Sequence, residues 1–102
     1  MRLSVGSRWR SAVDETQVVV IRAPQEDLEL TCGGHPLLPL DSEPGLSLVM
    51  AGGRDGGTVL GKRYADTSAS LELLCTKGGT GALFLGNAAL SVKAAKPLPS
   101  SD

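Results

Sequence analysis

The chain has 102 residues, of which 41% are hydrophobic, and its formal net charge is −1. This length corresponds to one domain, and the hydrophobic content excludes an intrinsically disordered chain. A charge close to zero argues against a nucleic-acid-binding protein, which needs many lysine and arginine contacts to phosphates, and no apolar run reaches the roughly 18 residues of a membrane-spanning helix.

The composition favours short β-strands. Aromatic residues make up only 3% of the chain, so the core has to be built from Leu, Val and Ala. Thirteen glycines and six prolines predict many turns, and many turns in a short chain imply short strands. Because small aliphatic side chains fill little volume each, we expect either a thin core or help from a second copy of the chain.

The N-terminal sequence MRLSVGSRWRS carries charges but has no apolar stretch behind them, so it does not fit a secretory signal peptide. We therefore expect a cytoplasmic protein, in which thiols stay reduced. The two cysteines, Cys32 and Cys75, are then expected to be free thiols.

Two strands are predicted near the start of the chain. Residues 7–13 place Trp9 between two arginines, which predicts a strand with a half-buried indole. Residues 16–23 contain four consecutive β-branched residues, Val18 to Ile21, and such residues pack well on a pleated sheet. Because this run has no polar alternation, the strand should be covered on both faces or lie centrally in a curled sheet.

The phrase LELTCGG at 28–34 returns as LELLCTKGG at 71–79, and the two copies contain both cysteines. Strand alternation places each cysteine on the same face as two leucines, with Glu29 and Glu72 on the opposite face, and the leucine face of a half-buried strand is the core. We therefore interpret both thiols as core filler ahead of glycine turns. The short match is either chance or a relic of a duplicated β unit. Since nothing else aligns between the halves, we do not expect a repeat protein.

Between the two phrases, residues 35–40 read HPLLPL, and two prolines limit this segment to an edge strand or a loop. Short strands are expected at 46–50 and 58–64, on either side of the glycine-rich loop GGRDGG at 52–57. The clearest hairpin is the last one, where Gly86-Asn87 separates two apolar runs in the manner of a two-residue primed turn.

The predicted fold is all-β: a small barrel or a two-layer sandwich of about six to eight short, mostly antiparallel strands. No segment has the sustained period and the caps of a helix. Residues 1–93 are expected to form a single β domain, and the Pro- and Ser-rich residues 94–102 a flexible C-terminal tail.

Three chemical interpretations of the cysteines compete with core packing. Cys32 and His35 have ligand-like spacing and Cys75 could supply a third ligand, so zinc is an alternative, with a carboxylate such as Asp41 or Glu43 completing the site. The two thiols could instead form a disulfide under oxidation if their strands are neighbours. A catalytic dyad of Cys32 and His35 is the third interpretation, and it needs the imidazole within hydrogen-bond reach of the thiol.

Two surface features could bind a ligand or a partner. Leu37, Leu38 and Leu40 form an exposed apolar strip if they are not tucked under the core, and such strips mark partner sites; closure of the core is the competing interpretation. The glycine-rich loop lacks the Gly-Lys-Ser/Thr ending of a phosphate-binding loop. Four cations would still line an anion site if their loops converge, and are ordinary solvated charges otherwise. These cations are Arg54, Lys62, Arg63 and Lys77.

These patterns predict a small soluble non-enzymatic β domain that associates with another protein or with itself, without a cofactor. An open strand edge is the expected means, because it is a template for pairing with another chain. Neither nucleic acid nor a membrane is an expected partner. The alternative is a metal- or thiol-dependent module that uses Cys32, His35 and Cys75. An enzyme is the third hypothesis, and its site would be formed by three loops. These loops are 33–36, 52–57 and 77–81.

Overall fold

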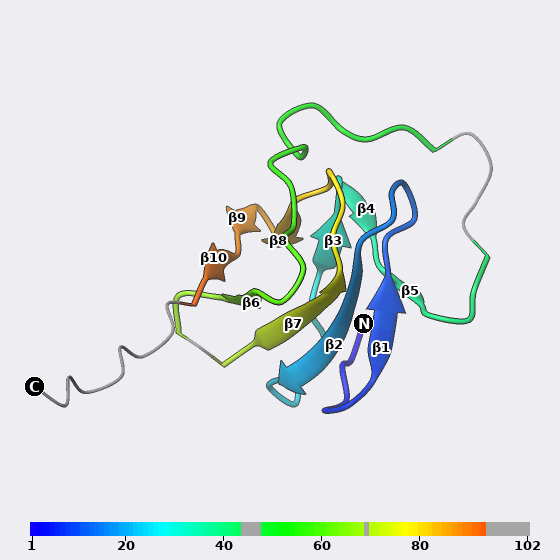
Figure 1. The fold of residues 1–102 in the computed structure, drawn as a ribbon. Helices are drawn as coiled ribbons and strands as arrows, with labels where there is room; N and C mark the ends of the chain where they lie inside the picture. The colour runs from blue at the N-terminus through cyan, green and yellow to red at the C-terminus, as the bar shows by residue number, and fades with distance from the viewer. Residues whose placement is uncertain (44–47, 69, 94–102) are drawn as a thin grey trace, which may run out of the picture.

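Ten short β-strands make up the regular structure of the described residues in the computed structural model of the chain (Figure 1). The structure describes residues 1–43, 48–68 and 70–93. In chain order the strands are β1 (Arg8–Arg10), β2 (Gln17–Arg22), β3 (Leu30–Cys32), β4 (His35–Pro36), β5 (Leu38–Pro39), β6 (Arg63–Ala65), β7 (Glu72–Lys77), β8 (Leu83–Leu85), β9 (Ala88–Ala89) and β10 (Ser91–Val92). Within the described ranges, no helix has the length and apolar character needed to cross a membrane.

The strands form two antiparallel sheets. The larger sheet has the order β10-β6-β7-β2-β1-β5, and the smaller sheet has the order β4-β3-β8-β9. Both sheets have end strands, so the fold is a two-layer sandwich rather than a closed barrel, and the predicted all-β fold is confirmed. The strands outnumber the prediction because four of the ten, β4, β5, β9 and β10, are only two residues long.

Three predicted segments need separate comment. Residues 94–102, predicted as a tail, lie outside the described residues, as do 46 and 47 of the strand expected at 46–50. Residues 48–50 of that expected strand are not in a strand. The strand expected at 58–64 is displaced toward the C-terminus, since β6 begins only at Arg63.

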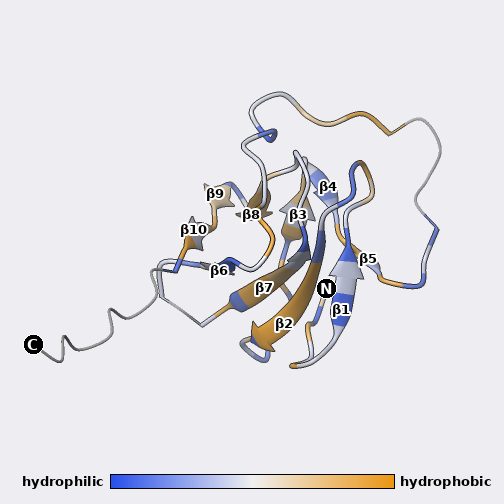
Figure 2. Cartoon of the chain, viewed as in Figure 1, coloured by the Kyte–Doolittle hydropathy of each residue, from blue (hydrophilic) through white to orange (hydrophobic). Residues whose placement is uncertain are grey.

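The core is formed by leucines, valines and both cysteines on the facing sides of the two sheets. In β2, Val18 and Val20 are buried while Val19 is only half-buried, so the side chains alternate even though the run is entirely apolar. Leu73 and Cys75 are buried on the neighbouring β7. Figure 2 shows β2 and β7 as hydrophobic over most of their length. β2 lies centrally in the larger sheet, which is one of the two positions that its sequence predicts.

The first five strands and the last five follow the same path and are related by an internal two-fold. β1 begins at Arg8 and β6 at Arg63, 55 residues later; β5 begins at Leu38 and β10 at Ser91, 53 residues later. Both sheet orders stay the same when β1–β5 are exchanged with β6–β10. The halves are joined by β2 pairing with β7 in one sheet and by β3 pairing with β8 in the other.

The register of the strands obeys the same symmetry. Val19 pairs with Leu74, its own equivalent in the other half, and Thr31 pairs with Phe84, which is likewise its equivalent. The two-fold axis therefore passes through these two pairs. Every residue pairing within the first half has its counterpart in the second half at the same spacing.

This structural repeat differs from the repeated phrase in the sequence. Cys32 lies in β3 of the smaller sheet and Cys75 in β7 of the larger sheet, so the two phrases occupy strands that are not equivalent. The expectation that the chain contains no repeat is wrong. The true equivalence is visible in few residues, such as the Gly-x-Arg-aromatic pattern at 6–9 and 61–64, because a strand position needs a side chain that fits the pleat rather than one particular residue.

Matching two-residue turns join β3 to β4 and β8 to β9. Gly33 and Gly34 have φ angles of +64° and +88°, and Gly86 has +59°. Positive φ at the first central position is the mark of a primed hairpin turn, which suits the twist of the flanking strands. The hairpin predicted at Gly86-Asn87 is confirmed. At Gly33-Gly34 the chain does more than end a strand, since it turns back into β4.

Candidate functional site

Two segments cross from the smaller sheet to the larger one, and each forms a corner of the sandwich. In the first corner, residues 35–39, Leu37 separates β4 from β5; in the second corner, residues 88–92, Leu90 separates β9 from β10. Both leucines are buried, at 3% and 8% exposure, and each donates its N–H to a carbonyl of the strand before the turn. Each corner therefore brings an edge strand of one sheet directly next to an edge strand of the other.

The hydrogen bonds of the second corner leave two residues with outward-facing backbone groups. Leu90 donates to a carbonyl of β8 at 2.9 Å, and Lys93 donates to a carbonyl of β6 at 2.7 Å. Hydrogen-bonded and non-hydrogen-bonded pairs alternate along an antiparallel ladder. Ala89 and Val92 each precede one of these donors, so their N–H and C=O groups point away from the neighbouring strand.

In the first corner, prolines occupy the two matching positions. Leu37 donates to a carbonyl of β3 and Leu40 to a carbonyl of β1 in the same pattern, and the residues that precede them are Pro36 and Pro39. Proline has no N–H, so this edge cannot complete a ladder with a further strand. The first corner is therefore called the closed corner, and the second the open corner.

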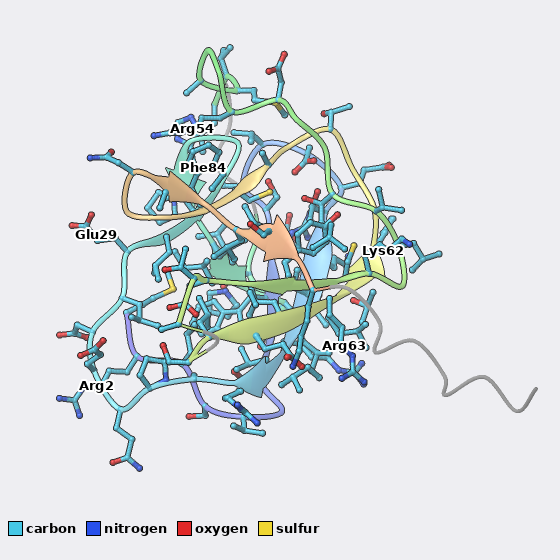
Figure 3. All side chains as sticks on the ribbon, turned by 90° about the vertical axis from the view of Figure 1, so that its left-hand side faces the viewer. Arg2, Glu29, Arg54, Lys62, Arg63 and Phe84 are labelled. Carbon is cyan, nitrogen blue, oxygen red and sulfur yellow. The ribbon has the colours of Figure 1, made fainter. Side chains whose placement is uncertain are left out.

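The open corner is exposed and uncharged. Its four strand residues, Ala88, Ala89, Ser91 and Val92, are all exposed. Natural edge strands are usually protected by a proline, a charge, a bulge or a covering loop, and none of these four residues is charged or a proline. Figure 3 faces this corner, with β9 and β10 toward the viewer.

A charged cluster lies beside the open corner on the outer face of the larger sheet. Glu72, with 5% of its side chain exposed, accepts hydrogen bonds from Lys93 Nζ at 2.7 Å and from Arg63 Nη1 at 3.4 Å. Arg22 lies opposite Glu72 across the β2–β7 pair. The hydrogen bond from Lys93, together with the positive charges around it, holds the pKa of Glu72 below its usual range. Three cations thus surround one carboxylate, and the cluster is net positive.

Cys32, a predicted site residue, lies in a buried polar cluster. Asp14 Oδ1 is 3.8 Å from Cys32 Sγ, and Asp14 Oδ2 accepts hydrogen bonds from Thr16 Oγ1 and from the Gly81 amide, both at 2.7 Å. Burial, and after it the negative charge of Asp14, raises the pKa of Cys32 to about 11. The thiol therefore stays protonated at neutral pH, which is its unreactive form.

The structure does not gather Cys32, His35 and Cys75 into one site. His35 Nε2 is hydrogen-bonded to the Val49 carbonyl at 2.7 Å. Cys75 belongs to the other sheet, and its thiol donates to the Lys77 carbonyl at 3.2 Å. In the part of the chain that the structure describes, no group of three or more His, Cys, Asp or Glu side chains is arranged to hold a metal ion. The geometry favours core packing of the thiols over the zinc site and the Cys–His dyad.

We expect neither thiol to react in the folded protein. Cys32 and Cys75 are both buried, and burial raises the pKa of each. Iodoacetamide near neutral pH should label the chain only after denaturant is added, as measured by intact mass. Fast labelling of either thiol in the absence of denaturant would contradict this assignment.

The predicted apolar strip is divided between the core and the surface. Leu37 is buried between the two sheets, whereas Leu38 and Leu40 are half-buried at the closed corner. Leu37 follows the interpretation in which this segment closes the core. The three leucines therefore do not form one exposed surface.

The cations proposed for an anion site lie apart. Arg54 stacks over the ring of Phe84, with its guanidinium carbon 3.7 Å from the ring centroid. Arg63 is paired with Glu72 on the larger sheet. Figure 3 shows Arg54 and Phe84 well separated from Lys62 and Arg63, so these cations do not converge on one anion.

The three loops named for an enzyme site do meet at one end of the sandwich. The Gly33 amide donates to the Ala82 carbonyl, and the Ala82 amide donates to the Arg54 carbonyl. Packing there is close, since a Cβ on Gly81 would lie 2.9 Å from Cys32 Sγ. The contacts are backbone hydrogen bonds and packing around a protonated thiol, and they close this end of the core.

The sequence predicts an open edge without saying where it lies. The signal is the replacement of Pro36 and Pro39 by Ala89 and Val92 at the same spacing, and it can be seen only once the two halves are aligned. No family model, curated protein or solved structure matches the chain. Its function therefore has to be inferred from the geometry of the corners.

Proposed function

We propose that this chain is a small non-enzymatic β domain of the cytoplasm that binds another protein, which adds a strand to the open corner. The observation that carries this proposal is the difference between the corners. Pro36 and Pro39 close one edge, whereas Ala89 and Val92 leave the other edge with outward N–H and C=O groups. Strand addition to an exposed edge is a recurrent mode of peptide recognition, in which main-chain hydrogen bonds supply the affinity.

The comparison between the halves strengthens the proposal. Because the two corners share one backbone path, Pro36 and Pro39 demonstrate that this fold accepts proline at both outward positions. The backbone therefore does not force the residues at 89 and 92 to be anything other than proline. An edge that could be protected at no structural cost, and is not, is the edge at which pairing is useful.

Transferring the prolines tests the proposal. The double variant Ala89→Pro, Val92→Pro removes both outward N–H groups, and the sandwich should tolerate it. Immobilised wild-type chain should retain at least one protein from a soluble extract that the double variant does not retain. When that protein is purified and added back, hydrogen exchange should slow at the amides of Ala89 and Val92, because these amides become ladder donors.

The matched control is Val92→Thr, which changes the side chain at the same edge and keeps the N–H. It should retain the partner, and circular dichroism should show that the double variant is folded. If the double variant retains every protein that the wild-type chain retains, or if exchange at both amides stays unchanged, the open corner is not the binding site.

A further inference from the structure

We infer that the strand added at the open corner is an extended segment of a different protein in which apolar and acidic residues alternate. This inference rests on the proposed function and specifies the chemistry of the partner. It follows from what lies on each face of the larger sheet beside β10, because successive residues of an added strand face opposite sides of the sheet.

The inner side of the added strand has to be apolar. Val92 pairs with Tyr64 on β6, and Tyr64 pairs with Leu73 on β7. Tyr64 and Leu73 are 6% and 0% exposed, so this row of side chains faces the core. Val92 ends the row and is 51% exposed. An apolar residue placed opposite Val92 would continue the row and remove Val92 from water.

The outer side of the added strand meets positive charge. Lys93 follows Val92 and lies on the outer face beside Arg63, with 46% and 56% of their side chains exposed. These two cations and Arg22 outnumber the single carboxylate of Glu72. A neighbouring strand would lie about 4.8 Å from β10, within reach of both exposed side chains. Acidic residues on its outer face would form cross-strand pairs with these cations.

A second copy of this chain fits the edge less well. Pairing two open corners about a two-fold would bring a second Lys93 and a second Arg63 to the same face. Their separation would fall within the Debye length of about 10 Å at 0.1 M salt. Like charges close together across strands are unfavourable, so the charge at this edge disfavours self-pairing and favours an acidic partner.

Three synthetic probes test the inference: fluorescein-labelled octapeptides in which valine alternates with glutamate, with glutamine or with lysine. In fluorescence polarisation with the wild-type chain, the Val–Glu peptide should bind at least about tenfold more tightly than the Val–Lys peptide, with the Val–Gln peptide between them. The difference should shrink as NaCl is raised, because the cations are exposed.

Two variants with the same change of net charge locate the effect. Lys93→Gln should weaken binding of the Val–Glu peptide by about threefold. Lys77→Gln removes an exposed cation at the opposite end of β7 and should leave the binding unchanged.

The outcomes separate this inference from the proposed function. If Ala89→Pro, Val92→Pro binds the Val–Glu peptide as tightly as the wild-type chain does, strand addition at this corner is wrong, and both proposals fail. If the double variant loses binding but the wild-type chain binds the Val–Glu and Val–Lys peptides equally, strand addition stands and the acidic partner is wrong. Absence of Val–Glu binding overturns the inference, and so does a wild-type dimer in sedimentation that the double variant converts to a monomer.

Discussion

Replacing Asp14 with alanine should lower the free energy of unfolding by about 2–4 kcal/mol. The carboxylate accepts hydrogen bonds from the Thr16 hydroxyl and the Gly81 amide, and both of these residues are buried. Without the acceptor, both donors lose their partner in a place that water reaches poorly. Denaturant unfolding followed by circular dichroism measures the loss.

The effect is expected to be large because Asp14 connects the two halves of the chain. Asp14 lies in the loop between β1 and β2, and Gly81 lies 67 residues later, just before β8. The same carboxylate is 3.8 Å from Cys32 Sγ on β3. One side chain therefore fixes the loops that close this end of the core. An alanine variant as stable as the wild-type chain would mean that the carboxylate is not a structural acceptor.

Asp14→Asn is the matched control, since its amide keeps one oxygen acceptor and should cost less stability than alanine does. Burial acts to raise the pKa of Asp14, but hydrogen bonds from Ser11, Gly81 and Thr16 outweigh it, and the pKa lies below its ordinary value. Such a carboxyl contributes stability above its unfolded pKa of about 3.9 and loses this contribution as pH falls through the folded pKa. The loss of stability in acid should therefore be smaller in the asparagine variant.

The asparagine variant should keep part of the acid sensitivity, because Asp66 and Glu72 also have lowered pKa values. Unfolding measured from neutral pH down to the acid limit, on both chains in the same buffers, gives the comparison. Identical pH profiles for the wild-type and asparagine chains would show that Asp14 does not titrate differently on folding.

Two-residue alternation predicts the packing of the cysteine strands correctly. It places Cys32 and Cys75 inward beside leucines, and both thiols are buried. It also places Glu72 on the outer face, where Lys93 and Arg63 then cover it. These successes depend on neighbouring residues of one strand. The covering of Glu72 could not be predicted in this way, because Lys93 comes from beyond β10, 21 residues later in the chain.

The internal two-fold is invisible to the same patterns. The equivalent strands β2 and β7 read QVVVIR and ELLCTK and share no residue. A sheet position requires the right size and polarity, so equivalent strands can diverge completely while they keep their register. The Leu-Glu-Leu-x-Cys phrase, by contrast, occurs in non-equivalent places, because short alternating strands draw repeatedly on the same few residue types.

The candidate site could be predicted only in part. The prolines at 36 and 39 identify an edge from the sequence alone, and β4 and β5 are end strands of their sheets. Which edge is open depends on the direction of the N–H groups of Ala89 and Val92, and this direction is set by pairing with β8 and β6. A shift of one residue in either register would reverse it, and no local pattern fixes that register.

Replacing Leu73 with alanine should lower the free energy of unfolding by about 2–5 kcal/mol. Leu73 is 0% exposed and pairs with Val20 on one side and with Tyr64 on the other, near the middle of the larger sheet. Truncation there leaves a cavity among side chains held by three strands, and such a site collapses poorly. Thermal or denaturant unfolding measures the loss directly.

Leu74→Ala supplies the control, because Leu74 is the next residue, lies on the opposite face of β7 and is only half-buried. It should cost less than about 1.5 kcal/mol, since less apolar surface is removed from contact. If Leu74→Ala destabilises the chain as much as Leu73→Ala does, the register of β7 is shifted. The register of β10 follows from β7 through β6, so the outward direction assigned to the Val92 amide would fall with it, together with the open corner.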